Sequence, residues 1–103
     1  MEISLSHSGG RARVELKGHV DEKGAETIKE QLRQIDYSNL REMVFDFREV
    51  NRIGSAGIGQ MLLVYKTLSV GGAKMRVENL SFSLLELFQG LKLDTLFQVQ
   101  GTD

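Results

Sequence analysis

The residues whose side chains could do chemistry are few, and most lie in the stretch from Asp46 to Gly57. This stretch follows an apolar segment and leads into a predicted helix, with Ser55 in the turn between them. A serine hydrolase needs a base beside its nucleophile. The histidines do not supply one, because we expect His7 in a strand at the core edge and His19 in a solvated loop. A hydrolase with Ser55 as nucleophile is thus a hypothesis without a base, testable by labelling with a serine-reactive probe.

Other sequence patterns of enzymes are missing as well. A nucleophile elbow has glycine two positions before the serine, and Ile53 occupies that position here. A phosphate-binding Walker A loop requires a lysine directly after its second glycine, and the sequence has no such loop. Glu42, Asp46 and Glu49 lack the spacing of an acid/base pair, so we interpret them as surface charges or caps.

Composition narrows the classes of function further. The chain has 103 residues, with 13 basic and 14 acidic side chains, a net charge of −1, and no cysteine, proline or tryptophan. The lack of cysteine excludes disulfides, thiolate zinc sites and cysteine nucleophiles, and two histidines leave little for a metal centre. A nucleic-acid-binding protein would show a basic excess. We therefore expect a protein that is not an enzyme, has no cofactor or metal, and does not bind nucleic acid directly.

The first third of the chain predicts a hairpin followed by a helix. Residues 3–7 and 12–16 alternate apolar and polar side chains on either side of Gly9-Gly10, which is typical of two strands joined by a tight turn. Asp21 is predicted to be the N-cap of an amphipathic helix over roughly residues 22–36.

The rest of the chain predicts strands and helices in alternation. Residues 43–47 are almost continuously apolar, which favours a strand covered on both faces, as the central strand of a helix-covered sheet. We expect a loop over residues 48–57 and a helix over about 57–70, ended by Gly71-Gly72. The remaining predicted elements are a strand over residues 74–79, a short helix capped by Ser81 and ended by Gly90, and a last short strand or helix at residues 96–99.

This order of elements predicts an α/β fold in a single domain spanning residues 1–103, with a mixed central sheet of about four to five strands and helices packed on it. No apolar run approaches the roughly 20 residues of a membrane span, and no signal peptide is recognisable. We expect a cytoplasmic monomer that does not bind membranes.

The second helix has a predicted surface that could contact a partner. Its core face is predicted to hold Ile58, Met61, Leu62, Tyr65 and Leu68, while Gly59, Gln60, Leu63 and Thr67 point away. An exposed Leu63 is either a partner contact or an ordinary surface leucine. Our hypothesis is that Ser55, Gly59, Gln60 and Leu63 form one docking strip. We interpret Gly57 and Gly59 as also allowing close backbone packing at the helix start.

Ser55 itself has two interpretations. It could simply cap the helix, as serine often does. Alternatively it could accept a phosphate, since a helix N-terminus offers free N–H donors and a positive dipole end. A phosphate would add about −1.5 to −2 charges. It would repel a docked partner while the domain stayed folded.

The stretch from Val44 to Gly57 resembles the signature of STAS domains, specifically stand-alone bacterial anti-sigma factor antagonists. The family pattern is a strand ending in Asp, a loop, and then hydrophobic-Asp-Ser-Ser/Thr-Gly-Leu-Gly at the start of a helix. Here Asp46 is followed by Ile53-Gly54-Ser55-Ala56-Gly57-Ile58-Gly59, and Gly18-His19-Val20-Asp21 matches the family's Gly-x-hydrophobic-Asp. The resemblance covers essentially the whole chain.

The resemblance implies a phosphorylation switch at Ser55. In the family, this serine is phosphorylated by a partner that is both an anti-sigma factor and a serine kinase of the histidine-kinase-like ATPase fold, and a PP2C-type phosphatase removes the phosphate. Only the unphosphorylated form binds the anti-sigma factor and frees the sigma factor. The resemblance implies that Asp21 also lies in the docking surface, together with the strip and the motif residues Gly54, Ala56 and Gly57.

The sequence departs from the family pattern at two positions. Gly54 stands where the family has Asp, and Ala56 stands where it has Ser or Thr, so that Ser55 carries the one hydroxyl of the motif. The alternative is a STAS module in another assembly, such as a stressosome-like scaffold, a lipid-transport complex or a biofilm regulator, in which Ser55 is only a cap. Gly54 is the feature that favours this alternative.

Overall fold

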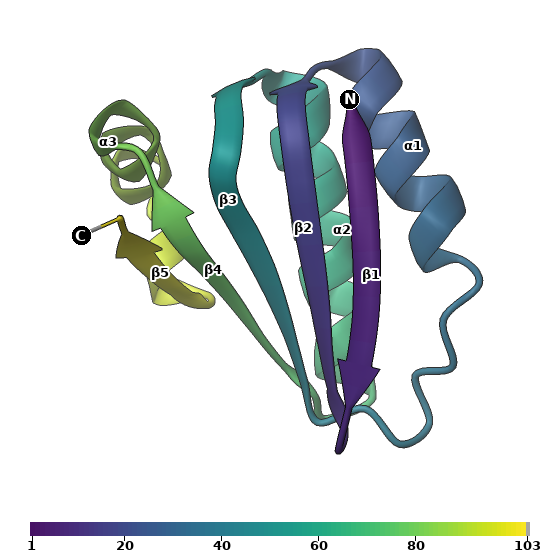
Figure 1. The fold of residues 1–103 in the computed structure, drawn as a ribbon. Helices are drawn as coiled ribbons and strands as arrows, with labels where there is room; N and C mark the ends of the chain where they lie inside the picture. Colours follow the sequence, from purple (N-terminus) through teal and green to yellow (C-terminus); the bar gives the residue numbers. More distant parts are fainter. Residues whose placement is uncertain (103) are drawn as a thin grey trace.

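A computed structural model describes residues 1–102 as an α/β domain with one mixed five-stranded sheet (Figure 1). The strands lie side by side in the order of the sequence. The first two are antiparallel, and each later pair is parallel, as predicted for a mixed sheet. The elements are β1 (Glu2–Ser8), β2 (Arg11–Val20), α1 (Glu22–Leu32), β3 (Glu42–Ile53), α2 (Ser55–Val70), β4 (Lys74–Leu80), α3 (Phe82–Gly90), the short 3₁₀ turn η1 (Leu93–Thr95) and β5 (Gln98–Gly101).

The predicted hairpin between β1 and β2 is confirmed. Gly9 and Gly10 form its two-residue turn with φ values of +56° and +83°. This left-handed backbone is accessible to glycine at little cost, and it matches the twist of the paired strands. The register then runs without a break from Ser8 opposite Arg11 to Glu2 opposite Lys17.

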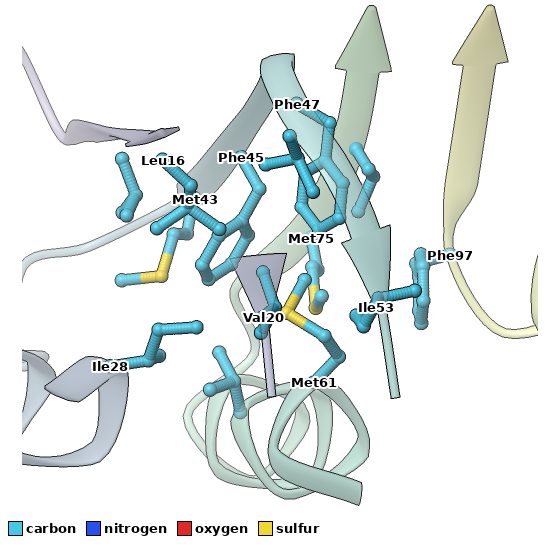
Figure 2. Close-up of a cluster of buried hydrophobic side chains, with 14 of the residues drawn as sticks. Leu16, Val20, Ile28, Met43, Phe45, Phe47, Ile53, Met61, Met75 and Phe97 are labelled. Carbon is cyan, nitrogen blue, oxygen red and sulfur yellow. The ribbon is translucent and has the colours of Figure 1, made fainter. Parts of the chain in front are cut away.

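All three helices pack on one face of the sheet, which we call the helix face. Figure 2 shows Ile28 of α1 and Met61 of α2 pointing toward the side chains of Met43 and Phe45 on β3. On the same face, α3 places Phe88 against Phe47, with ring centroids 5.8 Å apart. This arrangement follows from the topology, because each parallel connection moves one strand further in the same direction and right-handed crossovers then put every helix on the same side.

The prediction of a central strand covered on both faces is confirmed, because β3 is the middle strand and residues 43–47 are all buried, but helices cover only one of its faces. Val44 points to the other face, yet its side chain is 0% exposed. Its neighbours in the sheet are Arg13 on β2 and Arg76 on β4, and long arginine stems can shield apolar surface while their charged ends stay in water.

The charged ends of these arginines join an ion-pair network across the face that carries no helix, which we call the ion-pair face. Arg13 pairs with Asp46 at 2.8 Å and with Glu78 at 2.7 Å, and Arg76 pairs with Glu78 at 3.6 Å. Glu42 joins the network through Arg76, at 3.6 Å, and through Arg11, at 2.7 Å. Charged side chains from three strands therefore cover this face.

Several predicted boundaries also need correction. α1 ends at Leu32 rather than near residue 36, because Asp36 accepts hydrogen bonds from the backbone N–H and the hydroxyl of Ser38 and so favours a turn. β3 continues to Ile53 through residues predicted as a loop. Its last part pairs with β2 across register shifts.

The start and the core face of α2 also differ from the prediction. α2 begins at Ser55 rather than 57, and its buried residues are Gly57, Met61, Val64 and Leu68. Leu62, predicted in the core, is 37% exposed. The buried face is centred nearer Gly57 because the missing side chain there lets the helix lie directly against the end of β2. No helix among residues 1–102 is long and apolar enough to cross a membrane.

Candidate partner-docking site

The N-terminus of α2 presents Ser55 in an exposed position. Gly54 is the N-cap, with extended backbone (φ −97°, ψ −178°), and no side chain caps this helix. The Gly54 N–H donates to the Val20 carbonyl at 2.9 Å, and the Ile58 N–H donates to the Gly54 carbonyl at 3.0 Å. Ser55 is the first residue of the helix rather than its cap, so the interpretation of Ser55 as a simple cap is wrong.

Gly57 lies beneath this surface and holds α2 close to the sheet. A side-chain carbon at Gly57 would lie 2.6 Å from Cγ1 of Ile53 and 2.7 Å from the Val20 carbonyl oxygen. The close-packing interpretation of Gly57 is therefore confirmed, and its predicted place among the docking residues is wrong because it is buried. The close-packing interpretation fails for Gly59, which is exposed with open space around it.

A shallow groove runs between α1 and α2, and it brings together five of the predicted docking residues. Leu63 is its most exposed large apolar residue, at 58% exposure. Ser55 and Gly54 lie at the N-terminal end of α2, outside the lining itself. The groove is lined by Asp21, Ala56, Gly59, Gln60 and Leu63, which were predicted, and by Glu22, Lys23, Ala25, Glu26 and Lys29, which were not. Helical spacing places Glu22, Glu26 and Lys29 on one flank of α1, a signal that could have indicated this wall of the groove.

Asp21 has a structural role at one end of the groove. Its carboxylate accepts a hydrogen bond from the Gly24 N–H at 2.8 Å, which confirms it as the N-cap of α1. This backbone hydrogen bond lowers the pKa of Asp21 below its ordinary value. The side chain is exposed and charged at neutral pH, so the end of the groove nearest the start of α1 carries a fixed negative charge.

Asp46, interpreted from sequence as a surface charge or a cap, is buried within the ion-pair face. Only 8% of the residue is exposed. Its carboxylate accepts hydrogen bonds from Arg13, from the Asn79 side chain and from the Arg48 N–H, at 2.8, 3.0 and 3.0 Å. Burial alone would raise the pKa of Asp46, but the hydrogen bonds from Asn79, Arg48 and Arg13 outweigh it and the pKa is lowered.

Asn79 adopts a left-handed backbone (φ +61°), which asparagine tolerates better than most residues. Its side-chain oxygen accepts a hydrogen bond from the Arg48 guanidinium at 3.0 Å. The hydrogen bond from Asn79 to Asp46 joins β4 to β3, and the hydrogen bond from Arg13 to Asp46 joins β2 to β3. Asp46, the aspartate at the strand end of the family pattern, is thus a structural residue of the sheet rather than part of the docking groove.

Both histidines lie on strands. His7 is exposed on β1 rather than at the core edge, and His19 is exposed as predicted but belongs to β2 instead of a loop. Within residues 1–102, no group of three or more His, Cys, Asp or Glu side chains could hold a metal ion.

The structure thus combines a mixed sheet, helices on one face of it and an exposed serine at the start of α2. The family model described as "Mlab, STAS domain" matches residues 3–99, and the chain therefore belongs to the STAS-domain family. This confirms the resemblance found in the sequence.

Solved structures share the fold. A putative anti-sigma factor antagonist from Thermotoga maritima matches with a TM-score of 0.86 and 12% identity, over 97% of this chain and 86% of that one. The Bacillus cell fate determinant SpoIIAA in its phosphorylated form matches with a TM-score of 0.75 and 18% identity, over 95% and 90%. A sulfate transporter family protein from Wolinella succinogenes matches with a TM-score of 0.78 and 16% identity, over 88% and 76%. At these identities the likeness establishes the fold.

Proposed function

We propose that the protein is an anti-sigma factor antagonist of a cytoplasmic partner-switching pathway that regulates transcription. In its unphosphorylated form it binds an anti-sigma factor that is also a serine kinase of the histidine-kinase-like ATPase fold, and the sigma factor is released. Phosphorylation of Ser55 abolishes this binding, and a PP2C-type phosphatase restores it. The protein contributes no catalysis of its own.

The observation that carries this proposal is the exposed hydroxyl of Ser55 at an uncapped helix N-terminus beside the groove. Because Gly54 is the N-cap and α2 has no acidic residue in its first turn, no side-chain carboxylate of that turn competes for its N–H groups. A phosphate on Ser55 would be stabilised there by the N–H donors and the helix dipole. SpoIIAA, which shares the fold, has been solved in a phosphorylated form, and this supports phosphorylation as the kind of modification to test.

The switch itself is electrostatic. Asp21, Glu22 and Glu26 already line the groove, with Lys23 and Lys29 as the balancing cations. A phosphate adds about −1.5 to −2 charges beside them, on a chain whose net charge is −1. The docking surface thereby changes its potential while the hydrophobic core is untouched.

The experiment is incubation of the protein with its cognate kinase and ATP, followed by mass spectrometry of the peptides. We expect one phosphate, on Ser55, and none in Ser55→Ala. Ser69→Ala is the matched control, since Ser69 is exposed on the same helix and its loss should leave phosphorylation unchanged. Phosphate on another residue, or none at all, would disprove the assignment.

The groove is tested by the affinity for the same partner. Leu63→Asp should fold normally and bind at least tenfold more weakly, because it places a charge on the exposed apolar residue of the groove. Val70→Asp serves as the control, since Val70 is 87% exposed at the other end of α2. Unchanged affinity of Leu63→Asp would exclude the groove as the docking site.

A second candidate is a STAS interaction module in another regulatory or scaffold complex, such as a lipid-transport complex, without serine phosphorylation. Gly54 in place of the family Asp favours it. A pull-down distinguishes the two, because an ATPase of the histidine-kinase-like fold among the partners supports the antagonist. A membrane-transport ATPase without Ser55 phosphorylation would support the module.

A further inference from the structure

The outer edge of β1 is a long stretch of strand backbone with no neighbour in the sheet. Within residues 1–102, β1 pairs only with β2, along an unbroken register. Exposed sheet edges are usually protected by short strands, lysine, proline or a bulge. The opposite edge, β5, is short, with four residues and a register shift in its pairing. By contrast, β1 has seven residues without lysine, proline or a bulge, and Glu2 at its first position is its one acidic side chain.

The side chains of β1 suit contact with another strand. On the helix face, Ile3 and Leu5 pack against the core but are only partly buried. On the ion-pair face, Ser4, Ser6 and Ser8 are exposed and uncharged. A further strand beside β1 would complete the burial of the two apolar residues, and Glu2 at the end of β1 is the one carboxylate that it would meet.

We propose that β1 pairs with β1 of a second copy of this chain, antiparallel about a twofold axis at Leu5. Residues that lie directly opposite each other in an antiparallel pair point to the same face of the sheet. The helix-face residues of one β1 must therefore lie opposite helix-face residues of the other β1. The register that pairs all seven residues places Leu5 opposite Leu5, Ser4 opposite Ser6, Ile3 opposite His7 and Glu2 opposite Ser8. The two sheets then form one continuous sheet.

Charge complementarity favours a second copy as the occupant. Glu2 is the only acidic or basic residue in β1 apart from His7. In the proposed register Glu2 lies opposite Ser8 of the second copy, and Arg11 is the next residue across the sheet from Ser8. The Arg11 guanidinium itself pairs with Glu42 of its own chain at 2.7 Å, so Arg11 contributes positive charge to the neighbourhood of Glu2 without a direct ion pair. An isologous contact repeats this arrangement at both ends, so each Glu2 faces an uncharged serine and no carboxylates oppose each other.

The dimer leaves the proposed docking groove free, since the pairing uses no residue of α1 or α2. It differs from the monomer expected from the sequence, because composition does not show which strand lies at an open edge. The contact consists of one pair of short strands, so we expect a reversible, concentration-dependent dimer.

The test is a charge-swap experiment on the full chain, followed by sedimentation equilibrium. Ser4→Lys/Ser6→Lys places two pairs of lysines against each other across the axis, and Ser4→Glu/Ser6→Glu does the same with carboxylates. Each double variant alone should dimerise about tenfold more weakly than the wild type. An equimolar mixture should restore the dimer, because each pair then joins opposite charges. Such a rescue cannot arise from altered stability of the monomer, which circular dichroism checks in each variant.

A wild-type protein that stays monomeric up to about 1 mM overturns the proposal, as does a dimer that neither variant weakens or that mixing does not restore. Hydrogen exchange provides a second measurement. In the wild type, protection of β1 amides should rise with protein concentration, and exchange that is independent of concentration also contradicts the dimer.

Discussion

The two faces of the sheet are built from the same strands but exclude water in different ways. On the helix face, Met43, Phe45 and Phe47 are buried by helices and by one another. On the ion-pair face, Val44 is equally buried, although its cross-strand neighbours are Arg13 and Arg76, whose charged ends pair with carboxylates. A sheet face can thus be closed by paired charges on apolar stems, without a second layer of structure.

The largest effect is expected from the helix face. Phe47→Ala removes a side chain that is 0% exposed and packs edge-on against Phe88. It should lower the free energy of unfolding by about 3–5 kcal/mol, measured by urea denaturation. Leu62→Ala is the control, since Leu62 is 37% exposed, and its effect should be below about 1 kcal/mol. Equal losses in the two variants would mean that α2 does not pack with the observed face.

The next effect tests the buried carboxylate of the ion-pair face. Asp46→Asn should cost about 1–2 kcal/mol at pH 7, because it weakens hydrogen bonds from Arg13, Asn79 and the Arg48 N–H. Glu49→Gln, an exposed change on the same strand, should cost almost nothing.

Asp46→Asn also tests how the free energy of unfolding depends on pH. The pKa of Asp46 is lowered in the folded state, so its stabilising effect is present above its unfolded value of about 3.9 and is lost as the pH falls through the folded value. The difference between wild type and Asp46→Asn in the free energy of unfolding should therefore shrink between about pH 5 and pH 2. A difference that stays constant over this range would contradict the lowered pKa.

A smaller effect separates the stem of Arg13 from its charge. Arg13→Met keeps an apolar stem beside Val44 but removes the ion pairs to Asp46 and Glu78, whereas Arg13→Ala removes both. We expect Arg13→Ala to be less stable than Arg13→Met by about 1 kcal/mol in urea denaturation. If the two variants are equally stable, the stem does not contribute to covering Val44.

The smallest effect lies outside both faces, at the N-cap of α2. Gly54 has extended backbone and open space around it, so an aspartate fits there without strain. Gly54→Asp should raise the free energy of unfolding by about 0.5 kcal/mol, through the new cap and the loss of chain entropy in the unfolded state. Thermal unfolding measures this gain, and a loss of stability would show that the position does not accept a cap.

Features that depend on neighbouring residues could be predicted from the sequence. The Gly9-Gly10 turn, the Asp21 cap and the Ser81 cap of α3 are each defined within a few positions, and the structure contains all three. The order of strands and helices followed from the same local patterns.

Features that depend on distant pairing could not be predicted in this way. The hydrogen bonds to Asp46 come from Arg13 and Asn79, each 33 positions away, so its burial has no local signal. The last part of β3 is held by β2 across register shifts that interrupt the alternation of side chains. Similarly, the α1 wall of the groove exists only because α1 packs beside α2.

The position of Asp46 has a consequence for the order of folding. Its partners on β2 and β4 lie on opposite sides of it in the chain, so the carboxylate is fully bonded only after both parallel crossovers have closed. Such long-range pairings form late, after the entropy of closing two loops has been lost. We therefore expect the hydrogen bonds of Asp46 to form late in folding. They should lower the unfolding rate of the domain more than they raise its folding rate.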